Sequence, residues 1–402
     1  MFRELAEKMD ENSLVDLTRE LIRIPSFVSG IGQGSEKEIA TFTAETLSAA
    51  GFETHLQEVT RDRPNVIGIL RGEGGGHNLM LNSHLDTVEP YGMKIEPFSG
   101  IVKNGRIYGR GAADMKSALA AMIIAGKAIK ESNVHLRGDL IISSCSDEEG
   151  RASGSEHLAR TGLKVDMAIV GEPTELDLAV AQKGLTFIDI EVEGKATHGS
   201  QPEKGKNAIL VMNEIINRLK STYLTSLNKK EHNLLGKPTL NIGFIEGGYR
   251  PNVVADHCKI SIDRRIIPGE DCQTIEKEIN EVVRDFQIRD PDIKVKVNVL
   301  KWIKCLPSEI SPNEMIVRSA SENLEHVIGR KPRIIGAPYW TDAGSFINIM
   351  RIPVLVFGPG ELEQAHSSSE SIPIDILLAY TKTIFLTSLD ICTREKTDPG
   401  RM

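Results

Sequence analysis

The sequence has fewer basic than acidic residues. Lysine and arginine together number 48, aspartate and glutamate number 56, and the net charge is −8. A surface that binds nucleic acid or an anionic membrane needs an excess of basic side chains. We therefore expect neither a nucleic acid nor a membrane as a partner. An acidic chain instead suits a protein whose carboxylates hold cations.

The sequence also has no long apolar run. Its longest runs, such as 352–357, fall far short of the ~18 apolar residues of a transmembrane helix. The stretch 1–17 is charged, has a helical pattern and lacks the apolar segment of a secretory signal. These absences predict a cytoplasmic protein.

Cysteine is scarce: the chain has five, an odd number, scattered and without CxxC spacing. A disulfide framework or a zinc knuckle would need paired cysteines at characteristic spacings. We expect instead reduced thiols, as in cytosolic proteins. The residues concerned are Cys145, Cys258, Cys272, Cys305 and Cys392.

The 402 residues exceed what one hydrophobic core usually holds, roughly 250–300 residues, so we expect two domains. Up to residue 183 and again from residue 300, short apolar segments alternate with helical patterns; the helical segment 36–50 and the apolar segment 139–145 are examples. This alternation predicts an α/β fold with a mixed, largely parallel sheet flanked by helices.

The segment 184–299 has a different pattern. Its expected order is strand, helix, strand, strand, helix, strand, which is the ferredoxin-like arrangement. We predict that 184–299 is a separate α+β domain, inserted into a domain formed by 1–183 and 300–402. An insertion of this kind would explain why candidate ligands lie on both sides of it in the sequence.

Histidine and acidic residues follow four of the predicted strands, directly or after a few residues. In an open α/β sheet, ligands bind at the rim formed by the carboxyl ends of the strands. A cluster of carboxylates at that rim would repel itself unless cations were bound. The residues are His84 and Asp86, the run Asp147-Glu148-Glu149, Glu172 and His366.

Asp114 comes from a tight, glycine-rich turn at 109–114 that precedes a predicted helix starting near Met115. An aspartate at the start of a helix is often an N-cap. Capping and metal binding do not exclude each other, so both interpretations stay open at this point.

The combination of imidazole and carboxylate ligands suits zinc, and also cobalt or manganese. Five ligands are more than one tetrahedral zinc ion takes. They fit two divalent ions about 3.5–4 Å apart that share one carboxylate. We predict Asp114 as the bridging ligand and His84, Glu149, Glu172 and His366 as the other ligands.

Two further residues near this centre have predicted catalytic roles. Asp86 is spaced to accept the second ring N–H of His84 and so to fix its tautomer. Adjacent side chains diverge, so Glu148 and Glu149 cannot easily both bind metal. We assign Glu149 as the ligand and Glu148 as the general base that takes a proton from water and returns it to the leaving amine.

The motifs also form a pattern along the chain. In combination and order they resemble the acetylornithine deacetylase / succinyl-diaminopimelate desuccinylase family, which includes glutamate carboxypeptidases and aminoacylases. The segments are NSHLDTV (82–88), GRGAADMKSALAAM (109–122), DEEGRASGSEHL (147–158), VGEPT (170–174), KATHGSQPEKGKNAI (195–209), GGYRPNVVAD (247–256), IDRRIIPGED (262–271) and the late His366.

The resemblance implies a catalytic domain of the di-zinc exopeptidase type, interrupted by a smaller lid domain through which two chains form a homodimer. It agrees with Glu148 as base and Glu149 as ligand. It also implies that His198 of the lid reaches the partner's site and stabilises an oxyanion. Asn252 and Arg265 match positions that hold a substrate carboxylate; the spacing leaves Arg264 as the alternative to Arg265, and we prefer Arg265.

One segment departs from the family pattern. Residues 339–344 read Tyr-Trp-Thr-Asp-Ala-Gly, whereas desuccinylases carry Gly-Gly-Thr-Ser-Asp-Gly-Arg. The aromatic residues and the missing arginine argue against a strict desuccinylase and for a different acyl pocket. Within this segment we assign Gly344 to substrate binding.

Together these features predict a metal-dependent amidohydrolase that cleaves the amide bond of an N-acyl amino acid or a dipeptide-like substrate. A dipeptidase, a carboxypeptidase or an aminoacylase of the same family is the alternative. A non-catalytic metal-binding protein is an alternative of another class. Such a protein would be expected to lose Glu148 or a ligand, and this chain has them all.

Overall fold

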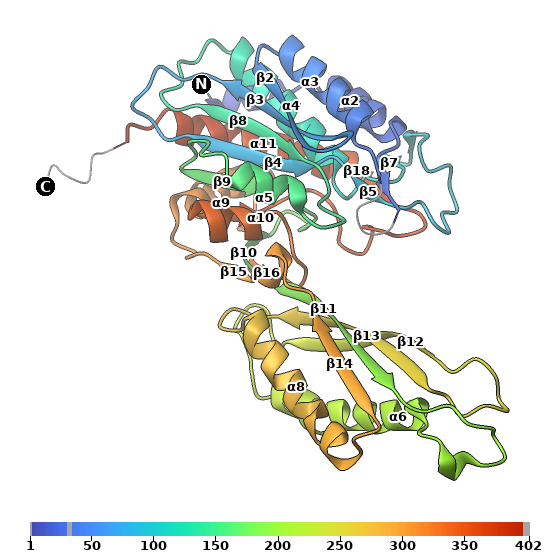
Figure 1. The fold of residues 1–402 in the computed structure, drawn as a ribbon. Helices are drawn as coiled ribbons and strands as arrows, with labels where there is room; N and C mark the ends of the chain where they lie inside the picture. Colours follow the sequence, from blue (N-terminus) through green and yellow to red (C-terminus); the bar gives the residue numbers. More distant parts are fainter. Residues whose placement is uncertain (1, 30–33, 397–402) are drawn as a thin grey trace, which may run out of the picture. The chain divides into compact units, whose positions relative to one another are not determined.

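The computed structural model describes residues 2–29 and 34–396, which fold into two compact units (Figure 1). Unit 1 takes the described residues within 1–180, 309–337 and 341–402. Unit 2 takes 181–308 and 338–340. Unit 1 is therefore built from both ends of the chain, and unit 2 from its middle.

The first part of unit 1 contains α1 (Phe2–Ala6), α2 (Glu11–Arg23), β1 (Phe27–Val28), α3 (Lys37–Ala49), β2 (Glu53–Thr60), β3 (Arg63–Leu70), β4 (Leu79–His84), β5 (Thr87–Val88), β6 (Ile101–Lys103), β7 (Arg106–Tyr108), α4 (Lys116–Glu131), β8 (Leu140–Cys145), α5 (Ser153–Ala159), β9 (Met167–Val170) and β10 (Leu178–Gln182). The later part contains β15 (Ser308–Glu309), α9 (Met315–Ile328), β16 (Ile334–Ala337), α10 (Ala343–Ser345), η4 (Phe346–Met350), β17 (Val354–Val356), β18 (Ser371–Pro373) and α11 (Ile374–Cys392).

The main sheet of unit 1 has the strand order β15-β10-β17-β9-β4-β8-β3-β2, with β16 added beside β10. The central strands β17, β9, β4 and β8 run parallel to their neighbours in this group. On the flanks, β10 pairs with β17, and β3 with β8 and β2, in antiparallel fashion. The expected mixed α/β sheet is confirmed, and its parallel part is confined to the centre.

Helices cover both faces of this sheet, with α4 and α11 on one side and α5 on the other (Figure 1). The central strands β4, β8 and β9 are buried along their whole length, as expected for strands covered on both faces. Helix α3 ends where the sequence predicted, because Gly51 has a φ of +88° that other residues rarely adopt. The long helices α4 and α11 bury most of their apolar residues.

Unit 2 contains β11 (Gly184–Glu193), η1 (Pro202–Lys204), α6 (Ala208–Arg218), η2 (Leu219–Tyr223), α7 (Leu224–Leu227), β12 (Thr239–Gly247), β13 (His257–Ile266), α8 (Cys272–Arg289), β14 (Lys294–Val299) and η3 (Ile303–Cys305). The order of its principal elements is β-α-β-β-α-β. Its sheet has the order β12-β13-β11-β14, and the registered pairs are antiparallel. This is the ferredoxin-like arrangement expected from the sequence.

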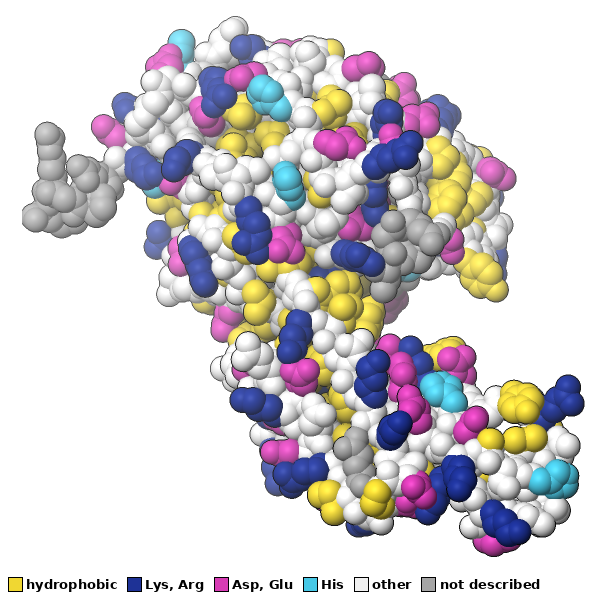
Figure 2. All heavy atoms as spheres, in the orientation of Figure 1, with side chains coloured by type: hydrophobic (Ala, Val, Ile, Leu, Met, Phe, Trp, Pro, Cys, Tyr) yellow, Lys and Arg dark blue, Asp and Glu magenta, His cyan; other side chains and the backbone are white. Residues whose placement is uncertain are grey.

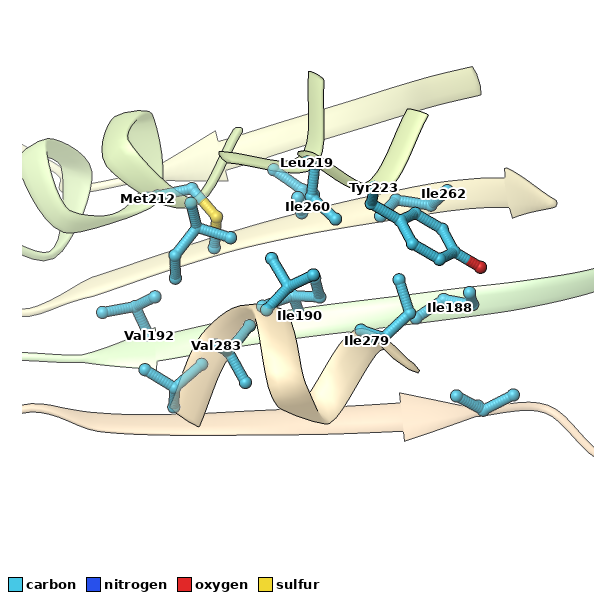
Figure 3. Close-up of a cluster of buried hydrophobic side chains, with 14 of the residues drawn as sticks. Ile188, Ile190, Val192, Met212, Leu219, Tyr223, Ile260, Ile262, Ile279 and Val283 are labelled. Atoms are coloured by element: carbon cyan, nitrogen blue, oxygen red, sulfur yellow. The ribbon is translucent and has the colours of Figure 1, made fainter. Parts of the chain in front are cut away.

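The core of unit 2 lies between its sheet and its helices (Figure 3). Alternate residues of β11 point into it, namely Ile188, Ile190 and Val192, because side chains of a strand alternate between its two faces. The helices contribute residues at helical spacing, namely Ala208, Met212 and Ile215 of α6 and Ile275, Ile279 and Val282 of α8. Unit 2 thus has a hydrophobic core of its own.

The prediction that all five cysteines are free is wrong. Cys272 at the start of α8 and Cys305 in η3 form a disulfide with a Cα–Cα distance of 6.1 Å. Their 33-residue separation has no motif that the sequence would reveal. Cys145, Cys258 and Cys392 are free and buried.

Basic and acidic side chains are interspersed over the face shown in Figure 2, with no extended area of one sign. Among the described residues, no helix combines the length and the apolar character needed to cross a membrane.

Candidate metal centre

The candidate metal centre lies in unit 1, at the carboxyl ends of its parallel strands. His84 is the last residue of β4, Glu148 and Glu149 follow β8, and Glu172 follows β9. Because β4, β8 and β9 are parallel neighbours, their ends deliver these side chains to one rim. His366 follows β17, the next parallel strand.

Two groups of side chains in this centre could each hold a metal ion. His84, Asp114 and Glu149 offer ligand atoms that lie within 4.8 Å of one another. His84, Glu148 and Glu172 form a second group with the same spacing. His84 belongs to both groups, so the two sets of ligand atoms lie next to each other.

The orientation of His84 is set by its own loop. Its ring is buried, and Nδ1 lies 2.9 Å from the main-chain oxygen of Asp86, which can only accept a hydrogen bond. Nδ1 therefore carries a proton. The other nitrogen, Nε2, faces the centre and lies 3.0 Å from Oδ1 of Asp114.

Asp114 lies between two histidines. Its Oδ1 faces His84, and its Oδ2 lies 3.2 Å from Nε2 of His366. Its side chain does not cap helix α4, whose N-cap is Met115 without a side-chain capping bond. The capping interpretation is therefore wrong, and each of the two oxygens faces a different histidine.

His366 joins the centre from the later part of the chain. Its Nε2 lies 3.0 Å from Oε1 of Glu149 as well as near Asp114. The side chain is half exposed, in contrast to the buried His84. The centre is thus closed on the His84 side and open on the His366 side.

Asp86 has a different contact from the one predicted. Its carboxylate lies 3.6 Å from Nδ1 of His84, beyond hydrogen-bond distance. Its two oxygens instead accept the main-chain N–H groups of Glu148 at 3.1 Å and Glu149 at 3.0 Å. Asp86 therefore fixes the His84 tautomer through its main chain, and its side chain holds the turn that carries the two glutamates.

The electrostatics of the centre suit bound cations. Burial raises the pKa of Asp86 and of Glu172, and neighbouring carboxylates raise both further. Burial alone would lower the pKa of His366, but Asp114 and Glu149 raise it to about 11. Burial alone would raise the pKa of Asp114, but the two histidines outweigh this and lower it. So many carboxylates need positive charge beside them, which protons or metal ions can supply.

A buried ion-pair network supports the turn after β8, and sequence reasoning missed it. Nε of Arg63 donates to Glu36 at 2.8 Å, and Nη1 of Arg63 lies 2.8 Å from Oδ1 of Asp147. All three side chains are buried. Asp147 also donates its N–H to Glu36 at 3.0 Å. The residue that precedes Glu148 is therefore held from two sides.

A second buried pair, Arg110 and Glu370, lies beside Asp114 and was also missed. No motif in the sequence marks either pair, because the partners are far apart along the chain. Glu36, Arg63 and Glu370 lie in polar segments of the sequence, so nothing in their local context indicates that they are buried or identifies their partners.

The predicted substrate-binding residues of unit 2 do not all come together. The His198 and Asn252 loops are adjacent, since Gly199 N–H donates to the Asn252 oxygen at 2.8 Å. Arg265 lies at the other end of β13, about 26 Å from His257 at the start of that strand. Arg264 is buried and paired with Glu270, whereas Arg265 is partly exposed. Of the two arginines, only Arg265 has a side chain accessible to a ligand.

Gly344 is buried in the short helix α10 of unit 1. Its N–H donates to the Thr341 oxygen at 3.0 Å, and its own oxygen accepts from Asn348 at 2.8 Å. Both main-chain groups are therefore used within the local turn, and no free donor is left for a substrate.

Comparison with known proteins gives a consistent picture. Residues 80–389 match the model of peptidase family M20/M25/M40. The chain is 32% identical to an acetylornithine deacetylase of Proteus mirabilis (strain HI4320), over 96% of this chain and 98% of the relative. It is 29% identical to the N-formyl-4-amino-5-aminomethyl-2-methylpyrimidine deformylase of Bacillus subtilis (strain 168), over 98% of both.

Among solved structures, the chain is similar to a tripeptidase of Staphylococcus aureus, with a TM-score of 0.80 and 25% identity. The similarity covers 96% of this chain and 100% of the tripeptidase chain. The likeness therefore extends over both units of the fold.

Proposed function

The chain belongs to peptidase family M20/M25/M40, and from that membership we propose that it hydrolyses the amide bond of an N-acyl amino acid. The protein is a metal-dependent amidohydrolase, and its relatives include a deacetylase and a deformylase. The observation that carries the proposal is Asp114, whose two oxygens face His84 and His366 within a cluster of carboxylates.

The donor set fits a pair of divalent cations. Asp114 would be shared between them, with His84, Glu149, Glu172 and His366 as the remaining ligands. Imidazole and carboxylate donors favour zinc, with cobalt or manganese as alternatives. When bound, such ions polarise a carbonyl group and lower the pKa of a water molecule.

Glu148 is the proposed general base. Its main-chain N–H is held by Asp86, and its side chain lies in the group with His84 and Glu172. In this position it accepts a proton from the attacking water and donates a proton to the leaving amine. Glu149, beside His366, serves as a ligand.

His198 is suited to stabilising an oxyanion. Its Nδ1 lies 3.2 Å from the N–H of Ser200, which can only donate. In the neutral ring the proton is therefore on Nε2, which becomes the hydrogen-bond donor. A donor at this position can stabilise the negative charge that develops on a tetrahedral carbon's oxygen.

We propose that two chains together build each complete site. His198 and Asn252 lie near one end of β13 and Arg265 near the other, so one small substrate cannot contact all three within one unit 2. If a substrate is bound by all three, His198 and Asn252 come from the partner subunit. Arg265 then offers its guanidinium to the substrate carboxylate.

The proposed homodimer interface is the face of unit 2 formed by β12 and α6. Strand β12 is an edge strand of the sheet, and its Phe244 and Ile245 are exposed. Ile209 and Leu210 of α6 are exposed as well. An unpaired edge with exposed apolar residues is a typical site of self-association.

Action as a dipeptidase, a carboxypeptidase or an aminoacylase is the alternative within this reaction class, and the structural likeness to a tripeptidase supports peptide cleavage. A small apolar difference in an acyl group changes binding by only about 1–3 kcal/mol, so pocket shape decides between these substrates. A non-catalytic metal-binding role would require that the wild-type protein bind metal without hydrolysing any of them.

A substrate screen tests the proposal. Metal-free protein is loaded with zinc, cobalt or manganese in turn and assayed with N-acetyl, N-succinyl and N-formyl amino acids and with dipeptides. We expect metal-dependent hydrolysis, greatest for an N-acyl amino acid. Hydrolysis of dipeptides alone would favour the alternative, and metal binding without any hydrolysis would contradict the proposed function.

A further inference from the structure

The segment that carries His366 has little regular structure of its own. It connects β17 to β18, and the 361–370 stretch contains no helix or strand. His366 itself has a φ of +60°, a conformation that residues other than glycine rarely adopt. A ligand on such a segment needs contacts from elsewhere in order to keep its position.

Glu370 provides such contacts, four residues after His366. Its carboxylate is buried, and its Oε1 accepts the main-chain N–H groups of Ala113 at 2.9 Å and Asp114 at 3.1 Å. Its Oε2 accepts from Nη1 of Arg110 at 2.6 Å. The Glu370 side chain therefore binds both the main chain of Asp114 and the guanidinium group of Arg110.

Other main-chain hydrogen bonds fasten the segment that carries His366 to the first part of unit 1. The N–H of Gly109 donates to the main-chain oxygen of Glu370 at 3.1 Å. The N–H of Lys94 donates to the oxygen of Ser368 at 2.8 Å. The His366 segment is thus fastened to the first part of unit 1, although unit 2 separates the two parts in the sequence.

We propose that Glu370, fixed by Arg110, is a positioning residue for the metal centre: it sets the main chain of Asp114 relative to the His366 segment. This inference rests on the proposed function, because it takes Asp114 and His366 as ligands. Asp114 can face both histidines only while its peptide N–H remains on Glu370. The role is indirect, since Glu370 contacts the main chain and none of the ligand atoms.

The neighbouring pair of Arg106 and Glu361 offers a matched control. Nη2 of Arg106 donates to Glu361 at 2.6 Å and joins the same two parts of the chain. It is partly exposed, and neither residue is hydrogen-bonded to Asp114. Glu361→Gln therefore removes one negative charge from the same segment without touching the Asp114 turn.

The test measures metal binding without a substrate. Metal-free wild type, Glu370→Gln, Glu370→Asp and Glu361→Gln are compared by circular dichroism and then titrated with Co²⁺, by calorimetry and by visible absorption. Glu370→Asp keeps the charge but shortens the side chain by one methylene. We expect both Glu370 variants to fold and at least one Co²⁺ to bind about 10- to 100-fold more weakly, the usual cost of losing a partner of a ligand.

The absorption of bound Co²⁺ should also change in the Glu370 variants, because it reports ligand geometry, and Glu361→Gln should match wild type in both measurements. Wild-type Co²⁺ affinity and spectrum in the Glu370 variants would overturn the positioning role and leave the proposed function intact. Loss of the folded state in both Glu370 variants would overturn it as well, since the residue would then serve the fold as a whole. A wild type that binds no metal would overturn the proposed function.

Discussion

His84 offers one ring nitrogen to the candidate centre because its other nitrogen is already in use. The main-chain oxygen of Asp86 accepts from Nδ1, which leaves Nε2 to face Asp114. The same loop then uses the Asp86 carboxylate to hold the N–H groups of Glu148 and Glu149. At the scale of single residues, one aspartate therefore orients a histidine and two glutamates.

Lys116, just after Asp114, is buried and its Nζ donates to the main-chain oxygens of Leu21 at 3.1 Å and Ile24 at 2.7 Å. Burial lowers its pKa from 10.5 to about 7, although Glu370 and Asp86 oppose the change. Between these two values the unfolded chain binds more protons than the folded one. The free energy of unfolding should therefore rise as the pH increases from about 7 to 10.5.

Urea unfolding of metal-free protein at several pH values checks this prediction. Lys116→Met should flatten the rise in the free energy of unfolding. Lys127→Met, on the exposed part of the same helix, should leave it unchanged. An equal pH dependence in wild type and Lys116→Met would show that the amine stays protonated in the folded protein.

At this scale the sequence identified residues in motifs and missed their partners. His84, Asp114, Glu149, Glu172 and His366 could be proposed because each follows a strand or a glycine-rich turn. Glu36, Arg63 and Glu370 could not, since their role depends on partners that only the folded chain brings close. The Asp86 contact was predicted with the wrong atom, because spacing does not distinguish a main-chain from a side-chain acceptor.

At the scale of elements, the turn after β8 is the most constrained part of the centre. Asp147 has a φ of +64°, which costs a non-glycine residue about 1–3 kcal/mol and persists only where surrounding contacts enforce it. Arg63 and Ser153 bind its carboxylate, and Glu36 binds its N–H. The buried network therefore maintains the turn that presents Glu148 and Glu149.

Glu36→Gln should destabilise the protein by about 3–5 kcal/mol, because it leaves the buried Arg63 without its full countercharge. Glu53→Gln is the matched control. Glu53 pairs with Arg71, which directly follows strand β3, the strand that begins at Arg63. Both side chains are exposed, so the loss of stability should stay below about 1 kcal/mol. Thermal and urea unfolding measure the loss of stability in both variants. Equal, small effects would show that the network does not support the fold.

The sequence predicted buried elements better than exposed ones. The predicted apolar segment 139–145 coincides with β8 to within one residue, because a short apolar run between polar segments is a clear signal. Strand β2 was not predicted: its residues are half-buried or exposed, and its sequence ETHLQEVT is largely polar. The Cys272–Cys305 disulfide was missed because it depends on how α8 and η3 pack, which spacing does not encode.

At the scale of the whole molecule, the inserted unit 2 is the part that links one chain to another in the proposed dimer. His198 and Asn252 lie together, and Arg265 lies at the far end of the same strand. In the proposed dimer, residues of one site therefore lie on two chains. It follows that a variant lacking His198 and a variant lacking Glu148 are inactive for different reasons.

Co-expression of Glu148→Gln and His198→Ala chains with different tags tests this sharing. Each mixed dimer keeps one intact site, made of Glu148 from one chain and His198 from the other. Random pairing should restore about a quarter of wild-type turnover. Co-expression of Glu148→Gln with His84→Ala should restore no turnover. Both residues lie in the metal centre of unit 1, so in a mixed dimer each centre lacks one of them. Equal results in the two mixtures would contradict a shared site.

The most direct test of the proposed two-metal hydrolysis is Glu148→Gln, measured for bound metal and for turnover of the best substrate from the screen. We expect two divalent ions per chain in both wild type and variant, with turnover lower by about 10²–10⁴-fold in the variant. Unchanged turnover would contradict Glu148 as the base. Loss of a metal ion together with turnover would instead make Glu148 a ligand.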